Sequence, residues 1–440
     1  MDLNYRKIKV ILDELQVENV AYDSGFHSRK PRKLSATELM TSFFKMILSG
    51  NFSYRLWASH LAYQIGDTVS FQAISQKLNR DNTDFFEQVL LKALSYRAHG
   101  SFGIQTNDLF APFDRVLVED STCFKLPKSL AEHFPGPKLP HGRKAMGRVQ
   151  ARFQLKSNTL ESVSITDFCK NDRTYANNVI GSLQPGDLVI RDLGYWRIKT
   201  LREIKSVSAY FLSRIPTSIN VYQSNDCEKL DLVTFLKQKA SKGCKQVDLD
   251  LQIGRKEKMP IRFIALKLTK EQAKRRMEMT KANRHKKCKM SEQAKYLSKW
   301  NLFVTNIDRK TWSPKCIYAA YNLRWHIEMM FKCWKSNFRF EQFFKHCKKQ
   351  NPMKPRIIVM LLLVWLVLFY QRLYNSYASK VWENYKELLS PMKFASFLKE
   401  HFRFIQQETE QYLLQRLTYY CTYDKRKDRK NHLEKFLFYP

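Results

Sequence analysis

The stretch Tyr321-Asn-Leu-Arg-Trp-His-Ile-Glu-Met-Met-Phe-Lys-Cys-Trp-Lys335 has the residue pattern of an amphipathic helix. At about 100° per residue, one face of such a helix carries a tyrosine, one acid and three bases, namely Tyr321, Arg324, Glu328, Lys332 and Lys335. The opposite face is apolar and is expected to pack on a core; it comprises Leu323, Ile327, Met330, Phe331, Trp334 and Phe338.

The polar face of this stretch suits chemistry on a phosphate. A carboxylate that binds a metal ion works beside donors that hold a polyanion, and Glu328 has a tyrosine, an arginine and two lysines around it. A plain solvated face of charged residues is the alternative. Residues elsewhere in the chain have to decide between the two.

The composition favours a nucleic-acid partner. The chain has 440 residues, which predicts two to four structural units, and 76 Lys and Arg against 41 Asp and Glu give a net charge of +35. A charge of this size favours nucleic acid over a membrane surface. The longest apolar run, Ile357 to Tyr370, is shorter than the roughly 18 residues that span a bilayer, and we expect a buried helix there.

The nine cysteines and the start of the chain indicate a reducing cytoplasm. The cysteines contain no C-x-x-C pair, so neither a disulfide framework nor a zinc ribbon is indicated. The chain opens with Met1-Asp-Leu-Asn, without the pattern of a secretory signal.

Two short β-branched runs each end in an aspartate. Arg115 to Asp120 is expected to be a buried strand that delivers Asp120 to its exposed tip, and Leu188 to Asp192 is a second strand of this kind. Strand alternation should point the neighbouring Glu119 to the other face of the sheet. A lone aspartate at a strand end is usually a turn residue, so these two gain weight only together with Glu328.

The rest of this region predicts a mixed α/β fold. Alternating runs at 148–156 and 159–167 predict a β-hairpin, whereas the prolines and glycines of 135–142 predict an irregular loop. A helix at 198–206 and a strand at 209–214 complete a β-α-β passage. Three adjacent antiparallel strands, the first bearing an acid, are the opening of an RNase H-like fold.

The first hundred residues are helical in pattern. Ser35-Ala-Thr-Glu38 is a capping box before the apolar run Leu39 to Leu48, and Gly50 closes that helix. Short helices at 54–63 and 71–78 follow, among basic residues. This region is either a small DNA-binding unit or a plain helical bundle with a basic surface.

Glu328 follows Asp192 by 136 positions, and this separation implies an insertion. Alternating runs at 247–253 and 261–267 predict strands, a basic stretch from Lys270 to Lys299 predicts a helix or loop, and Trp300 begins a returning strand. Packing in the core of the insertion is one of two interpretations of Trp300.

Tyr321, Arg324, Glu328 and Lys335 have the spacing Y-x2-R-x3-E-x6-K, and this resembles the signature of the YREK group of DDE insertion-sequence transposases, an IS-four-like group. In that family the Glu is the third catalytic acid. The surroundings of the first two acids are similar as well, with Asp120-Ser-Thr and Asp192-Leu-Gly-Tyr. The resemblance covers about 114–373 in detail and the two ends only in general character.

The resemblance implies a DNA transposase that cuts at transposon ends and joins the freed 3′-OH to target DNA. It implies catalytic and metal-binding roles for Asp120, Asp192 and Glu328, and DNA-binding roles for Tyr321, Arg324, Lys335, Trp300 and Lys332. In relatives, a Trp at the position of Trp300 stacks on a flipped base, which is the alternative to core packing. A site made only of acids favours Mg2+ or Mn2+ over Zn2+, and two ions are implied.

The expected organisation follows from these patterns. We expect a helical, DNA-binding region at 1–105, an RNase H-like core in two parts at 106–214 and 306–376, a β-rich insertion at 215–305 and a helical region at 377–440. The implied partner is double-stranded DNA, both terminal inverted repeats and target, bound by a homodimer, with no membrane. The implied location is the bacterial cytoplasm, at the nucleoid.

Two other functions fit the same residues. One is a sequence-specific DNA-binding protein without catalysis, and the other is an RNase H-fold nuclease without strand transfer. Metal-dependent nicking of DNA would distinguish a transposase from a DNA-binding protein without catalysis. Joining of a 3′-OH end to a second DNA would distinguish a transposase from a nuclease.

Overall fold

The chain folds into two compact units. The computed structural model describes residues 3–31, 33–96, 108–223, 228–255, 258–282, 290–405 and 408–424. One unit contains 1–105, 121–170 and 325–434, and the other contains 106–120 and 171–324 together with the last six residues. Strand β1 (Val116–Leu126) contributes to both, because the division falls between Asp120 and Ser121.

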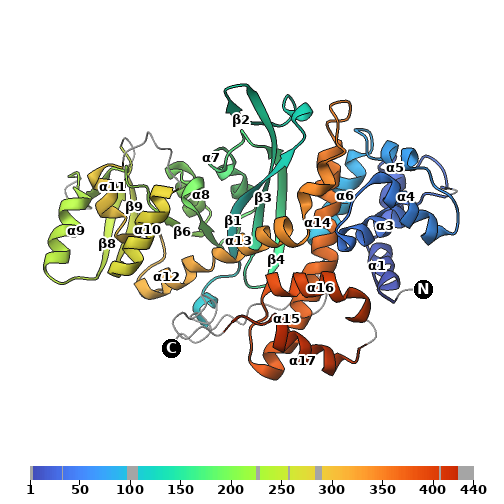
Figure 1. Cartoon of the computed structure of the whole chain (residues 1–440). Coiled ribbons are helices and arrows are strands. Elements are labelled where there is room, and N and C mark those ends of the chain that lie inside the picture. Colours follow the sequence, from blue (N-terminus) through green and yellow to red (C-terminus); the bar gives the residue numbers. More distant parts are fainter. Residues whose placement is uncertain are drawn as a thin grey trace. The chain divides into compact units, whose positions relative to one another are not determined.

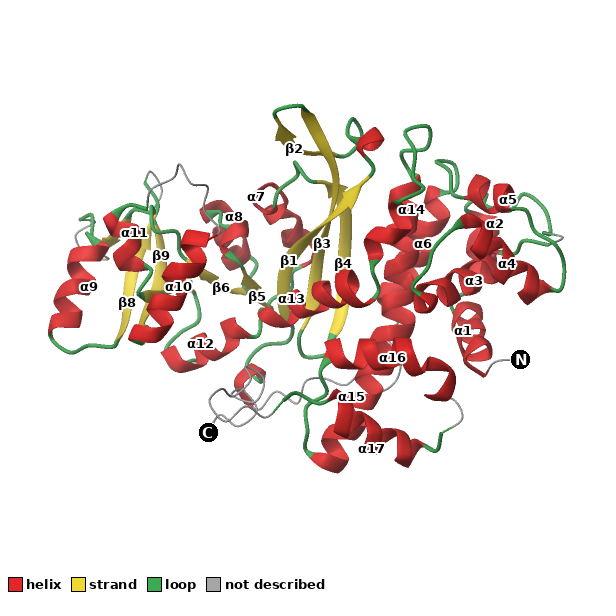
Figure 2. Cartoon of the chain, viewed as in Figure 1, coloured by secondary structure: helices red, strands yellow, loops and turns green. Residues whose placement is uncertain are grey.

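The larger unit begins with helices that pack on a long apolar helix. Ser35 caps α3 as predicted, since its hydroxyl accepts a hydrogen bond from the amide of Glu38, and Gly50 ends the helix with a φ of 70°. The N-terminal helices are α1 (Leu3–Glu14), α2 (Val17–Asp23), α3 (Ala36–Ser49), α4 (Tyr54–Ile65), α5 (Phe71–Lys77) and α6 (Thr83–Ser95). Helix α14 (Lys354–Trp365) packs on α3 and α6 (Figure 2).

The predicted buried helix at 357–370 is confirmed as part of a longer helix. A continuous helical run covers Lys354–Tyr385, through α14, a π-helical turn at Leu366–Gln371 and α15 (Arg372–Tyr385). By length and composition this helix could cross a membrane, but 83% of its most apolar window is buried inside the protein. The apolar side chains therefore serve the core of this unit.

The same unit carries an antiparallel hairpin and the C-terminal helices. The predicted hairpin is confirmed as β3 (Gly142–Gln154) and β4 (Thr159–Asp167). The predicted loop at 135–142 is wrong, because Pro135–Leu139 forms the strand β2 at the edge of the sheet, where proline is tolerated. The remaining helices are α13 (Trp325–Lys332), α16 (Pro391–Ile405) and α17 (Glu410–Cys421).

The other unit is a mixed sheet with helices against it (Figure 1). Its strands follow the order β1-β5-β6-β10-β9-β8-β7, with β1, β5 and β6 parallel and the others antiparallel. The strands after β1 are β5 (Leu188–Arg191), β6 (Tyr210–Arg214), β7 (Val221–Gln223), β8 (Gln246–Ile253), β9 (Met259–Lys267) and β10 (Trp300–Thr305). The helices are α7 (Asp172–Tyr175), α8 (Ile198–Ser206), α9 (Leu232–Ser241), α10 (Lys270–Ala282), α11 (Glu292–Leu297) and α12 (Pro314–Asn322).

The strands predicted at 247–253 and 261–267 are confirmed within two residues at each end, and the predicted strand that begins at Trp300 is β10. The first two strands could be predicted because apolar and polar residues alternate along them. The apolar residues, such as Leu251 on β8 and Phe263 on β9, pack in a core that also contains Trp300. Helix α9 and strand β7 were not predicted. The sequence also carries a basic cluster near its end, Lys425-Arg-Lys-Asp-Arg-Lys430, which lies outside the described residues.

Candidate active site

Asp120 and Asp192 each directly follow the last paired residue of two parallel strands. Strands β1 and β5 are in register from Val116 opposite Leu188 to Glu119 opposite Arg191, and the aspartates are the next residues of each strand. The prediction for Asp192 is confirmed, because β5 ends at Arg191. Asp120 is not at a strand tip, since β1 continues to Leu126 beyond the end of its partner β5.

Asp192 accepts a hydrogen bond from Tyr321. The Tyr321 hydroxyl lies 3.2 Å from Asp192 Oδ1, and the tyrosine is buried at 8% exposure, with its ring 5.0 Å from that of Phe303. Burial, and after it the charge of Asp192, raises the pKa of Tyr321 well above its ordinary value. The hydroxyl therefore stays protonated and acts as a fixed donor to the carboxylate.

Asp120 forms an ion pair with Arg324. The distance from Arg324 Nη1 to Asp120 Oδ2 is 2.9 Å, and the two side chains are 15% and 17% exposed. The Arg324 guanidinium also lies 5.9 Å from the centre of the Tyr321 ring. The two aspartates are thus held by Tyr321, in the last turn of α12, and by Arg324, in the turn that follows this helix.

Glu119 has a separate, structural role. Its carboxylate lies 2.5 Å from Arg191 Nε, and both side chains are buried at 3% to 4% exposure. Arg191 also donates to the carbonyl of Ala176 at 2.8 Å. The prediction that Glu119 points away from Asp120 fits this pairing, which locks β1 to β5 one residue before the aspartates.

Asp172 is an acid near this site that the sequence did not single out. A Cβ atom at Gly194 would lie 2.9 Å from Asp172 Oδ2, so a larger residue at this position would require the Asp172 side chain to move. The Asp-x-Gly pattern was the available signal. The glycine indicated that the backbone passes close to another group, but the pattern did not identify that group as the Asp172 side chain.

The single helix predicted for 321–335 is wrong. Helix α12 ends at Asn322, and the amides of Leu323 and Arg324 bond to the carbonyls of Ala320 and Tyr321, which tightens the turn before α13 begins at Trp325. A π-helical turn, Cys333–Asn337, follows α13 and contains Lys335. Neither glycine nor proline marks these changes, so periodicity alone could not reveal them.

Glu328 lies on α13 in the larger unit and is partly exposed, and Lys332 and Lys335 are exposed. A buried polar network anchors this helix. His326 Nε2 lies 2.9 Å from Asn158 Oδ1, and the backbone carbonyl of Asn158 accepts from Gln371 and Asn375. Burial lowers the pKa of His326 to about 4, so the ring is neutral and donates through Nε2.

Trp300 is a core residue, which corrects its expected role in stacking on a base. Its side chain is 1% exposed and belongs to the core formed by β8, β9 and the neighbouring helices. A ring enclosed on both faces offers no surface to a base. The alternative of core packing was the right one.

The oxygen donors of the aspartate pair suit a divalent cation such as Mg2+. Within the described part of the chain, no three His, Cys, Asp or Glu side chains form a ready metal cluster. Asp120 is instead paired with the Arg324 guanidinium, and Asp192 accepts a hydrogen bond from the neutral Tyr321 hydroxyl. The donor chemistry therefore fits such an ion, and these two contacts compete with it.

Residues 111–366, more than half of the chain and including Asp120, Asp192 and Glu328, match the family model of the transposase DDE domain. The chain belongs to this transposase family. Its function is DNA transposition.

Insertion-sequence transposases are similar to this transposase over most of their length. The transposase of IS231B from Bacillus thuringiensis subsp. berliner is 27% identical over 348 residues, 74% of this chain and 71% of the relative. The transposase of IS1151 from Clostridium perfringens is 25% identical over 360 residues, 77% and 75% of the two chains. A solved piggyBac transposase synaptic complex aligns at 9% identity with a TM-score of 0.40, over 94% of this chain and 84% of that one.

Proposed function

We propose that this transposase is a member of the YREK group and that Asp120, Asp192 and Glu328 are its catalytic acids. The observation that carries the proposal is the pairing of the signature with the acids. Tyr321 donates a hydrogen bond to Asp192, and Arg324 forms an ion pair with Asp120. Each candidate aspartate therefore contacts one residue of the signature. A solvated charged face gives no reason for these two contacts.

Glu328 is the third acid in this proposal. It follows Arg324 by four residues, which span at most about 14 Å of chain, and Arg324 contacts Asp120. Lys335 and Lys332 are exposed bases on the same stretch and are proposed to bind DNA phosphates with Tyr321 and Arg324. An Arg binds a phosphate through two parallel bonds, and a Lys acts as a mobile charge.

The strand arrangement supports an RNase H-like core with a β insertion. Strand β1 neighbours β3 and β5 in the sheet. Strand β3 pairs with β4 in an antiparallel hairpin, whereas β1, β5 and β6 are parallel. The strands from β7 to β9 with α9 and α10 then form the insertion before β10 returns. The five regions expected from the sequence stand as the domain organisation of this proposal.

The chemistry rests on the carboxylates and the bases. Two Mg2+ or Mn2+ ions, when bound by the three acids, would activate the attacking oxygen and stabilise the leaving one. Tyr321 orients one oxygen of Asp192 and leaves the other for a metal. Arg324 balances the charge of Asp120 in the free protein and can turn to a DNA phosphate as the cut strand enters.

The nucleophile is proposed to be water in the first step, which frees a 3′-OH at the transposon end. That 3′-OH then attacks target DNA, so no covalent protein intermediate is needed. The proposed partners are terminal inverted repeats and target DNA, held by a homodimer at the nucleoid of a bacterial cytoplasm. The net charge of +35 supports a polyanionic partner.

Replacement of each acid tests the proposal. Asp120→Ala, Asp192→Ala and Glu328→Ala are each expected to abolish Mg2+-dependent nicking of DNA that carries the element's ends, and to retain DNA binding. Glu292→Ala, an exposed acid on α11, is the matched control and should nick normally. Chelation of the metal should stop wild-type nicking, and full nicking by one of the three variants would remove that residue from the site.

The same assay separates the alternative functions. A protein that binds element ends but never nicks them in Mg2+ or Mn2+ would be a DNA-binding protein without catalysis. Nicking without transfer of the 3′-OH to a second DNA would indicate a nuclease.

A further inference from the structure

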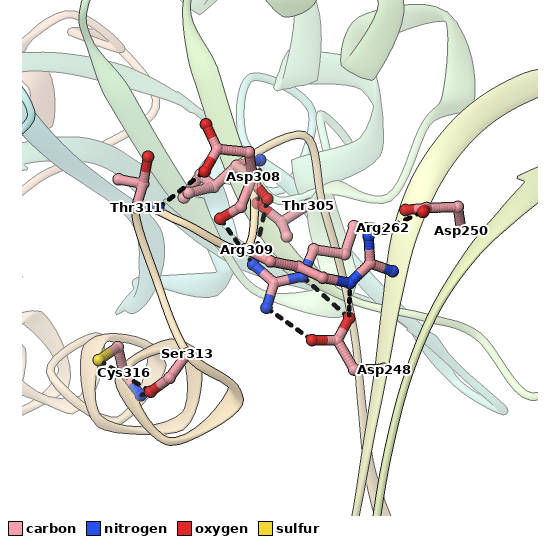
Figure 3. A network of polar contacts seen from close by, with 10 residues as sticks. Asp248, Asp250, Arg262, Thr305, Asp308, Arg309, Thr311, Ser313 and Cys316 are labelled. Carbon is pink, nitrogen blue, oxygen red and sulfur yellow. Dashed lines mark hydrogen bonds and ion pairs between the residues drawn. The ribbon is translucent and has the colours of Figure 1, made fainter.

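Arg262 ties the β8–β9 hairpin of the insertion to the loop that leads into α12 (Figure 3). Its side chain is buried at 4% exposure and donates to both carboxylate oxygens of Asp248, at 3.0 and 2.8 Å. The same guanidinium donates to the backbone carbonyls of Ile307 and Asp308, at 3.2 and 2.9 Å. One arginine therefore joins strand β8 to the backbone of a loop from another part of the chain.

This loop, residues 306–313, is also bound to the core sheet. Asn306 bonds to the backbone of Ala209 and Phe211 at the start of β6, at 2.9 and 2.8 Å. At its other end, the Trp312 side chain is buried and donates to the carbonyl of Leu109 at 2.8 Å. Ser313 then caps α12, because its hydroxyl accepts from the amide of Cys316.

Helix α12 leads directly to the residues that hold the aspartates. It starts at Pro314, directly after the loop; Tyr321 lies in its last turn, and Arg324 follows two residues after its end. We propose that Arg262, clamped by Asp248, is a positioning residue: it sets the start of α12 and thereby the contacts of Tyr321 with Asp192 and of Arg324 with Asp120. This inference rests on the proposed function and gives the insertion a role in forming the active site.

The chemistry of the clamp requires an arginine. A planar guanidinium presents donors in fixed directions, so it can bind a carboxylate on one side and two successive carbonyls on the other. A lysine ammonium cannot span these groups. Arg309 provides a contrast in the same network: it bonds to Asp248 and Asp250 at 3.3 and 2.7 Å, but its side chain is 45% exposed. Exposed pairs of this kind contribute little.

Arg262→Lys tests the proposal, with Arg309→Lys as the matched control. Arg262→Lys is expected to increase amide hydrogen exchange across 307–322 in metal-free protein and to slow nicking at saturating DNA about tenfold. Arg309→Lys should change neither. Normal exchange across 307–322 in Arg262→Lys would overturn the proposal.

A double-mutant cycle with Tyr321→Phe distinguishes positioning from a general loss of stability. If Arg262 acts through Tyr321, the double variant should nick little more slowly than the slower single variant, whereas independent effects multiply. Multiplying effects would overturn the proposal. If Arg262→Lys fails to fold by circular dichroism, Asp248→Asn takes its place, with the same expectations. Absence of nicking by the wild type would instead refute the proposed function.

Discussion

At the scale of single residues, the site is built from charged groups that already have partners. Asp120 and Asp192 are each bound by a neighbour from the end of α12, and Glu119 is bound by Arg191 on the next strand. Because a buried charge is costly without a partner, these pairs set which acid faces the solvent and which one faces the core. Asp120 and Glu119 are consecutive residues with opposite roles for this reason.

Arg324 is expected to act on the cut strand and not on metal binding. Arg324→Ala should retain metal affinity in calorimetry and should lose nicking and strand transfer on DNA with element ends. Arg324→Lys should restore little, because an ammonium cannot reproduce the two parallel bonds of a guanidinium. The assignment is wrong if Arg324→Ala loses metal binding as fully as Glu328→Ala, or if Arg324→Lys behaves as the wild type.

His27 should make folding stability depend on pH. It is buried at 6% exposure, and burial, followed by the charge of Lys77, lowers its pKa from 6.5 although Glu18 acts in the opposite direction. As the pH falls below about 6.5, the unfolded chain binds the proton more readily than the folded one, so the free energy of unfolding should decrease. Urea unfolding of the wild type and His27→Gln between pH 7.5 and about 5 measures this; parallel pH profiles would contradict it.

At the scale of elements, short junctions decide how the helices are placed. Helix α12 is set by the loop 306–313, and α13 is set by the buried amides around Asn158 in the β3–β4 turn. At both junctions, side chains from other segments donate hydrogen bonds to backbone carbonyls. Such bonds do not depend on the side chains of the loop itself. The tight turn at Leu323 and Arg324 separates α12 from α13.

Asn158 should be important for the stability of the larger unit. It has a φ of 51°, and its side chain bonds to His326 and, at 2.5 Å, to Asn375. Asn158→Ala should cost about 2 to 3 kcal/mol, because buried donors and acceptors lose their partners and alanine disfavours this backbone conformation. Asn158→Gly keeps the backbone conformation and isolates the hydrogen bonds; if it unfolds in urea like the wild type, the network contributes nothing.

At the scale of the whole molecule, net charge and burial separate two kinds of function. A charge of +35 on 440 residues favours DNA, and the apolar helix Lys354–Tyr385 is mostly buried in the core of its own unit. Membership of the transposase DDE-domain family agrees with the charge. The division between the two compact units falls within β1: Asp120 ends one segment of its unit, and Ser121 begins a segment of the other.

Binding to DNA should weaken steeply as salt rises. Each phosphate contact releases counterions, so the logarithm of the binding constant should fall with the logarithm of salt concentration at a slope of about −0.9 per contact. Filter binding between low and physiological salt measures the slope. Charge-conserving Arg309→Lys should leave the slope unchanged, and a flat titration of the wild type would count against DNA as the partner.

The sequence by itself determined the parts that depend on local pattern. Alternation located β8 and β9, a short β-branched run located β5, and the capping box located α3. The spacing around Glu328 indicated the family before any contact was known. These features follow from the period of a helix or strand and from the residue types that a reaction needs.

Only the tertiary structure decided which distant segments meet. Trp300 is enclosed in a core, β1 continues past Asp120, and Arg262 reaches the loop before α12, because other segments pack there. The end of α12 at Asn322 could not be predicted from the neighbouring residues either. The turn there is accompanied by contacts of Tyr321 and Arg324 with aspartates far away in the sequence. Pairings of this kind depend on how the whole chain packs, and a local period carries no information about them.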